Sequence, residues 1–140
     1  MYSTFIPEQI LRSFVGIEDA VSNDGNHPPH DIVRLNDTTW VVGIAAAGFG
    51  KDDITVTQQQ NRLIVSGRKD RTHYHELANE FGSDEPEYLY QRLARRAWER
   101  TFRLMEDIRV ERAEYVDGVL YVILKRIVPE EKQPRRIEIR

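Results

Sequence analysis

Short apolar runs alternate with polar turns along most of the chain. The runs are four to eight residues long and rich in β-branched and aromatic side chains, and they lie at residues 32–35, 40–45, 54–57, 63–67, 98–104 and 108–115. Gly48 and Gly50 end the second run, and a polar turn is expected at Gln58–Asn61 after the third. A succession of short strands with turns between them is typical of an all-β sandwich of two antiparallel sheets.

The clearest pattern spans Ala113–Lys125. Asp117-Gly118 predicts a tight turn between two strands, because Gly tolerates positive φ and Asp can hydrogen-bond its own backbone. The second strand is apolar on both faces: Leu120, Val122 and Leu124 alternate with Val119, Tyr121 and Ile123. We expect one face to pack against the opposite sheet, and the other to meet another segment of the chain or another subunit.

In the N-terminal region the apolar residues follow a helical spacing instead of the two-residue alternation of strands. Its apolar side chains are Phe5, Ile6, Ile10, Leu11, Phe14 and Val15, and their i, i+4 spacing predicts a helical stripe. A helix this short is marginal in water, so the arm either packs on its own domain or offers an apolar surface to other chains. Asn23–Pro29 consists of turn formers and linker residues. Residues 1–29 are therefore interpreted as arm and linker, and residues 30–127 as the domain.

Residues 68–96 interrupt the strand pattern with charged residues, Gly82 and Pro86. This long connection contains one strand-like piece, Tyr88-Leu89-Tyr90. A connection of this length in a compact domain usually has a function of its own. The piece could pair with the sheet edge of a neighbouring subunit, which would make a dimer, or it could form a local surface hairpin.

The tail, residues 128–140, is polar and contains two prolines, which keep it extended. It ends with Ile137 and Ile139 on one face of a strand-length segment. An Ile-x-Ile pair on a polar tether suits strand addition into an apolar groove. Such a contact is weak by itself, so only many tethered copies would hold an assembly together.

The composition limits the classes of partner that the chain is expected to bind. The 20 basic and 23 acidic side chains give a net charge of −3, which predicts attraction neither to nucleic acid nor to a membrane. The absence of cysteine excludes disulfides and thiolate metal sites and is compatible with a reducing compartment. No apolar run approaches the roughly 20 residues of a membrane span. The N-terminus lacks the pattern of a secretory signal, so a cytoplasmic location is expected.

The sequence gives little support for a catalytic site or a cofactor site. The histidines are His27, His30, His73 and His75. His73 and His75 would share a face of a strand, but no third metal ligand accompanies them. Gly48–Lys51 lacks the spacing of a phosphate-binding loop and is interpreted as a bend between strands. With no Ser, His and acid set that stands out, we expect no enzyme activity and no cofactor.

A basic cluster with interleaved aromatic residues is the one feature that could bind nucleic acid. Its members are Arg92, Arg95, Arg96, Arg100 and Arg103, with Tyr90, Trp98 and Phe102. Such a set could stack on bases and neutralise phosphates. Nearby carboxylates, among them Glu87, Glu99 and Glu106, reduce the positive field. We therefore favour an interface rich in Arg–carboxylate pairs.

Several motifs resemble those of small heat-shock proteins. Ala113-x-x-x-x-Gly118-Val119-Leu120 is similar to the signature of the alpha-crystallin domain, and Ile137-x-Ile139 is similar to the family's C-terminal anchor. Further matches are Pro28-Pro29, Ala45–Phe49, Leu63-x-Val65-x-Gly67 and Trp98-x-Arg100-x-Phe102. The resemblance covers residues 28–140 and is strongest to the bacterial class that includes the inclusion-body-binding proteins. Two departures are Leu104-Met105, where Leu-Pro is common, and Trp98, where Phe is usual.

The resemblance implies an immunoglobulin-like sandwich that forms dimers, assembles into larger oligomers and holds unfolding proteins without ATP. It implies that the anchor binds between two edge strands of a neighbouring dimer, in a groove formed here by Ile54, Val56, Val110 and Ala113. It also implies a dimerisation loop at residues 68–96, with Tyr88–Arg92 as the exchanged strand. The corresponding dimer contacts would be Tyr88, Leu89, Tyr90, Arg92 and Arg100. Related small heat-shock proteins and ATP-dependent refolding chaperones are further implied partners.

Two functional classes follow. The first is a chaperone-type oligomer in which like subunits cover the arm and groove until apolar client surface replaces them. The second is a sandwich without chaperone activity that docks one specific protein partner. Suppression of the heat aggregation of an unrelated enzyme distinguishes the two classes.

Overall fold

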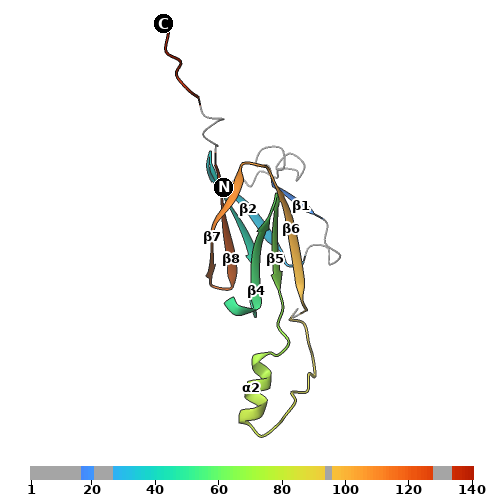
Figure 1. Ribbon diagram of the computed structural model, residues 1–140. Helices are drawn as coiled ribbons and strands as arrows, with labels where there is room; N and C mark the ends of the chain where they lie inside the picture. The colour runs from blue at the N-terminus through green and yellow to red at the C-terminus, as the bar shows by residue number, and fades with distance from the viewer. Residues whose placement is uncertain (1–16, 21–26, 94–95, 128–133) are drawn as a thin grey trace, which may run out of the picture.

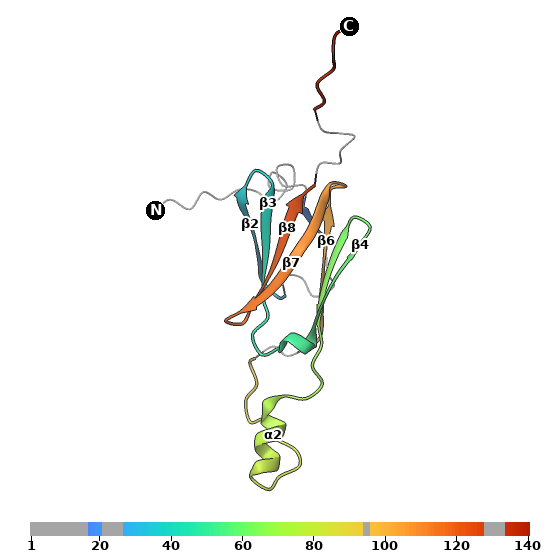
Figure 2. The same ribbon diagram turned by 60° about the vertical axis from the view of Figure 1, so that its left-hand side comes forward.

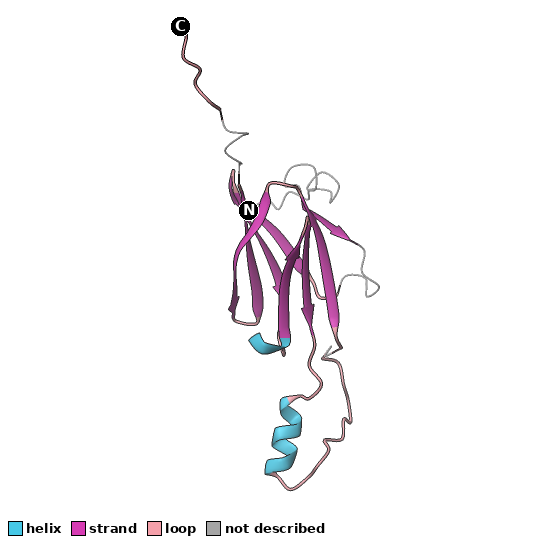
Figure 3. Cartoon of the chain, in the orientation of Figure 1, coloured by secondary structure: helices cyan, strands magenta, loops and turns pink. Residues whose placement is uncertain are grey.

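The computed structural model describes residues 17–20, 27–93, 96–127 and 134–140. The described residues form strands joined mostly by short turns, with one α-helix on a long excursion (Figures 1 and 3). The elements are β1 (Ile17–Ala20), β2 (His30–Asn36), β3 (Thr39–Ala45), the 3-10 helix η1 (Lys51–Asp53), β4 (Ile54–Gln59), β5 (Arg62–Gly67), α2 (His73–Glu80), β6 (Trp98–Leu104), β7 (Ile108–Val116) and β8 (Val119–Arg126).

The strands form two antiparallel sheets that pack face to face (Figure 2). One sheet has the order β1-β6-β5-β4, and the other has the order β2-β3-β8-β7. The all-β sandwich expected from the sequence is therefore confirmed. No helix in the described part of the chain is both long and apolar enough to cross a membrane.

The core lies between the sheets and follows the two-residue period of the strands. In β6 the inward row is Trp98, Arg100, Phe102 and Leu104, all of them buried. The facing sheet contributes Val42 and Ile44 from β3 and Leu120, Val122 and Leu124 from β8. One inward position of β6 is thus occupied by a guanidinium group instead of an apolar side chain.

The predicted hairpin at Asp117-Gly118 is confirmed. Val116 pairs with Val119 across the turn, and both turn residues have positive φ, 52° and 80°. Positive φ at both central positions fits the twist of the flanking strands. The outer face of β8 is unevenly covered, because Ile123 is 9% exposed while Tyr121 is 36% exposed.

Besides the short 3-10 helix η1, two elements were not predicted from the sequence. Ile17–Ala20 forms β1, which pairs with β6 through Ile17–Leu104 and Ala20–Thr101. Within the long connection, His73–Glu80 forms α2, which projects beyond the end of the sandwich (Figure 1). The Thr72 hydroxyl caps this helix by accepting a hydrogen bond from the Tyr74 amide at 3.3 Å. The helical stripe predicted for residues 5–15 lies outside the described residues.

Candidate protein-interaction site

The end strands of the two sheets, β4 and β7, enclose an open hollow on one side of the sandwich. We call it the edge hollow. Its volume is about 490 Å³, and its lining residues are Lys51, Ile54, Val56, Ala113, Glu114, Tyr115, Val116 and Leu120. Each strand has its sheet partner on one side only. The hollow therefore combines apolar side chains with backbone groups at two strand edges, which is what an added strand requires.

Three of the four groove residues expected from the sequence line the edge hollow. Ile54 and Val56 belong to the half-buried row of β4, and Ala113 comes from β7. Val110 does not line the hollow; its side chain packs against the core, and its amide donates to the Gln58 side chain. A bulge in β7 between Val110 and Arg112 shifts the register there, so Val110 and Ala113 occupy different environments.

Beyond the lining residues, the side chain of Gln58, expected from the sequence in a turn, bridges β4 and β7. Gln58 belongs to β4 and points inward in the same row as Ile54 and Val56. Its Nε2 donates to the Ile108 carbonyl at 3.1 Å, and its Oε1 accepts from the Val110 amide at 2.9 Å. The predicted Gln58–Asn61 turn is therefore too long, since β4 continues to Gln59 and Gln58 joins the two sheets.

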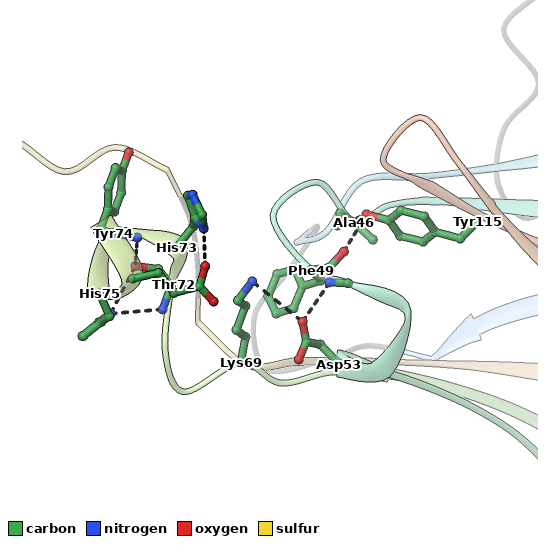
Figure 4. Close-up of polar contacts among 11 residues, drawn as sticks. Ala46, Phe49, Asp53, Lys69, Thr72, His73, Tyr74, His75 and Tyr115 are labelled. Atoms are coloured by element: carbon green, nitrogen blue, oxygen red, sulfur yellow. Dashed lines mark hydrogen bonds and ion pairs between the residues drawn. The ribbon is translucent and has the colours of Figure 1, made fainter. Parts of the chain in front are cut away.

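One end of the hollow is fixed by Tyr115 (Figure 4). Its hydroxyl lies 3.0 Å from the Ala46 carbonyl and 2.6 Å from the Phe49 carbonyl. Nearby, Asp53 accepts from the Gly50 amide at 2.8 Å and pairs with Lys69 at 3.9 Å. These contacts hold the loop before β4 against β7, so the hollow has a firm wall at this end.

The outer rim of the hollow is charged. Glu114, which lines the hollow, accepts a hydrogen bond from Arg112 at 2.9 Å. The hydrogen bond and charge of Glu114 raise the pKa of the Arg112 guanidinium above its ordinary value. The pair is solvent-exposed and contributes little to stability, so it can exchange partners.

The tail leaves its own edge hollow empty. Residues 134–140 are extended and stand away from the sandwich in both ribbon views (Figures 1 and 2). Ile137 is 75% exposed and Ile139 is 95% exposed. Two large apolar side chains at such exposure, two residues apart, are available to another molecule.

The long connection also exposes apolar side chains. Tyr88 packs edge-on against Tyr74 of α2 with ring centroids 5.7 Å apart, and its hydroxyl lies 3.3 Å from that of Thr72. Leu89 and Tyr90 point away, with 88% and 81% of their surfaces exposed. In this single chain the Tyr88–Arg92 stretch is neither a strand nor part of a local hairpin.

Arg100 lies apart from the exposed loop residues. It is only 1% exposed, and its Nη2 lies 2.8 Å from Nδ1 of His30 at the start of β2. His30 also packs edge-on against Phe102, with centroids 5.3 Å apart. Arg100 therefore contacts the first residue of the β2 edge from inside the sandwich and does not reach the surface itself.

The described members of the basic cluster do not form one surface, and Arg95 lies outside the described residues. Trp98, Arg100 and Phe102 point into the core, where they cannot stack on bases, and Tyr90 is exposed on the long connection. In the described residues, no three His, Cys, Asp or Glu side chains are grouped as metal ligands. His73 instead contacts Glu76 at 2.6 Å, and His75 lies 3.6 Å from Glu85.

The protein family of this chain follows from a comparison with known proteins. The profile of the Hsp20/alpha crystallin family matches residues 32–140, which is more than half of the sequence. The chain belongs to this family. The resemblance seen in the sequence is thereby confirmed.

Relatives within the Hsp20/alpha crystallin family agree along most of the chain. The chain is 39% identical over 129 residues to the small heat shock protein IbpA of Escherichia coli (strain K12 / DH10B), covering 91% of this chain and 87% of the relative. The same figures hold for IbpA of Shigella boydii.

Solved structures of small heat shock proteins share the fold at lower identity. The protein from Synechococcus phage S-ShM2 gives a TM-score of 0.57 at 23% identity, with 81% of this chain and 99% of the other covered. A C-terminally truncated AgsA from Salmonella typhimurium gives 0.56 at 17% identity, with 80% and 98% covered. At these identities the likeness concerns the fold alone.

Two polar residues of this Hsp20/alpha crystallin chain were not recognised from sequence as part of the site. Gln58 bridges β4 and β7 next to the edge hollow, and His30 accepts a hydrogen bond from the buried guanidinium of Arg100. The only sequence signal for Gln58 is its position two residues after Val56, in phase with the apolar row of β4. His30 carries no comparable signal, because its partner is 70 residues away along the chain.

Proposed function

We propose that the chain is an ATP-independent molecular chaperone that self-assembles and binds unfolding proteins to prevent their aggregation. Membership of the Hsp20/alpha crystallin family supports the chaperone role. The observation that carries the assembly mechanism is the apolar edge hollow together with the exposed Ile137 and Ile139. In the proposal, the tail of one subunit enters the edge hollow of another.

The energetics favour a reversible contact. Burying one Ile side chain contributes about 1.5–3 kcal/mol. Ordering the tail and restricting the motion of two subunits offset much of the gain from two side chains. Each tail contact is therefore weak, and a large particle is held by many of them at once. Loss and rebinding of single tails expose apolar surface without unfolding the sandwich.

Client binding follows as a competition. An unfolding protein presents extended apolar segments, which match the same combination of strand edge and apolar hollow that accepts a tail. When clients are abundant, their segments replace tails and shift the population toward opened particles. The exchange requires no nucleotide, because both states are held by apolar contacts of similar strength.

The building block of the proposal is a dimer. Strand β2 is an end strand of its sheet and exposes Val33 and Leu35. In the proposed dimer, Tyr88–Arg92 of one subunit adds to the β2 edge of the other. The contact between Arg100 and His30 supports the first residue of this edge from inside the sandwich. Leu89 and Tyr90 would then exchange solvent for a neighbouring sheet.

We expect Leu89→Ser with Tyr90→Ser to weaken the dimer. The two changes remove apolar side chains that are 88% and 81% exposed in the single chain, so folding of the sandwich is expected to be unaffected. Native mass spectrometry should show monomers at concentrations where the parent chain is dimeric or larger. Phe81→Ser is the matched control, because Phe81 is 82% exposed on the same connection but lies outside the exchanged stretch. Equal loss of dimer in the control would contradict the assignment.

The chaperone role is tested by heating an unrelated enzyme with the purified chain in the absence of ATP. We expect light scattering from the aggregating enzyme to be suppressed at about equimolar ratios of chain to enzyme. Absence of suppression would favour a module that docks one specific partner. Recovery of enzyme activity after addition of an ATP-dependent chaperone system would test transfer of the held client, which belongs to the same proposal.

A further inference from the structure

We infer that Gln58 sets the register of the strand that docks in the edge hollow. The inference rests on the proposed entry of a neighbour's tail. It assigns to Gln58 a positioning role that is separate from the apolar contacts of Ile54 and Val56. In this role the side-chain amide limits how far along β7 a docked strand can pair.

The hydrogen bonds of Gln58 copy those of a paired strand. In a parallel ladder, one residue donates its N–H to a carbonyl of the neighbouring strand and accepts from the amide two residues further on. The Gln58 side chain makes this pair of bonds, to the Ile108 carbonyl at 3.1 Å and from the Val110 amide at 2.9 Å. A docked strand therefore finds these two backbone groups of β7 already bonded.

The backbone of β7 beyond this point is different. The bulge between Val110 and Arg112 separates the blocked part from the part that borders the edge hollow, where Ala113 and Glu114 lie. A tail that slid toward Val110 would lose pairing groups to Gln58 and would place an Ile side chain against the amide. A tail beside Ala113 meets neither obstacle.

The apolar spacing agrees with a single register. Ile137 and Ile139 are two residues apart, a rise of about 6.6 Å in a strand. Ile54 and Val56 have the same spacing, and Gln58 takes the next inward position of β4. The row thus changes from apolar to amide after two positions, which matches a tail with two apolar side chains.

The absence of cysteine from the chain allows a direct measurement of the register. One population carries Glu138→Cys, between the two Ile side chains of the tail. A second population carries either Glu114→Cys, beside the hollow, or Arg109→Cys, beside Gln58. The two reporter positions are roughly 15 Å apart along β7. A disulfide spans at most about 7 Å between Cα atoms, so each reporter detects its own register.

Subunits are exchanged between the populations, oxidised, and the mixed disulfides are quantified by mass spectrometry. With Gln58 present, we expect linkage to position 114 to exceed linkage to position 109 by about tenfold, as the loss of two hydrogen bonds predicts. Gln58→Leu in the reporter chain should bring the two yields within about threefold of each other. Gln59→Leu is the matched control, because Gln59 is the exposed neighbour and makes no hydrogen bond to β7.

Each other result overturns the inference in a recognisable way. If position 114 is linked and Gln58→Leu leaves the ratio unchanged while lowering the melting temperature, Gln58 only ties the sheets together and the tail proposal stands. If neither reporter is linked when Gln58 is present, the tail does not enter the hollow and both proposals fail. Should the leucine variant precipitate, Gln58→Asn replaces it, because the shorter amide cannot reach both Ile108 and Val110.

Discussion

Replacing Ile137 and Ile139 with alanine is expected to reduce the native particle to its dimeric building block. The two side chains are 75% and 95% exposed in the single chain, so they add nothing to the sandwich itself. Each loses roughly 2 kcal/mol of transfer free energy on truncation to alanine. Together this weakens one tail contact by two to three powers of ten in its dissociation constant, on the scale of about 1.4 kcal/mol per tenfold change.

The measurement is size-exclusion chromatography with light scattering at two temperatures. Far-ultraviolet circular dichroism should give a melting temperature close to that of the parent, since no buried residue is changed. Arg136→Ala with Glu138→Ala is the matched control, because it alters the same strand-length segment but keeps both apolar side chains. An unchanged mass for the isoleucine double variant would remove the tail from the assembly mechanism.

Most of the sandwich could be predicted because each strand carries its own local period. Alternation in residues 54–57 and 98–104 predicts which side chains face inward, and β4 and β6 follow that alternation. Asp117-Gly118 predicts its turn from backbone preferences alone. Such signals require no knowledge of distant residues, and they determine the fold class.

The two unpredicted elements have weak local signals. Helix α2 contains no buried residue, so it shows no strong apolar stripe, although Thr72 as a cap and the run Glu76-Leu77-Ala78 favour a helix. Strand β1 has only four residues, and its pairing with β6 joins positions more than 80 residues apart. Local propensity does not determine a pairing of that range.

The polar residues of the site were the least predictable. Gln58 reads as part of a turn because it opens the polar run Gln58–Asn61, and its phase with Val56 does not reveal its bonding partners on β7, 50 and 52 residues away. Arg100 reads as a surface charge, yet the position two residues before Phe102 makes it a core residue. Sequence periodicity assigns a polar residue to a face, but its bonding partner is set by how the two sheets meet.

A second large effect is expected from Gly67→Ala at the end of β5. Gly67 pairs with Trp98 across β5 and β6, and a Cβ atom at this position would lie 2.5–2.7 Å from three atoms of the indole ring. The ring has little room to move, because Trp98 is only 3% exposed and packs edge-on against Phe49 with centroids 6.0 Å apart. The added methyl group therefore requires either a shift of β6 or a strained rotamer of Trp98.

We expect Gly67→Ala to lower the free energy of unfolding by about 3 kcal/mol, at the upper end of the usual cost of overpacking. For a chain of this size the melting temperature should fall by roughly 3–4 °C per kcal/mol, which differential scanning fluorimetry resolves. Gly50→Ala is the matched control, because its new Cβ would meet only the Asp53 carboxylate at 3.4 Å, and a change within about 0.5 kcal/mol is expected. Trp98→Phe in the Gly67→Ala background should recover part of the loss, since a phenyl ring lacks the indole nitrogen and the fused ring atoms that approach position 67. If the double variant is no more stable than the single one, the cost does not arise from the indole contact.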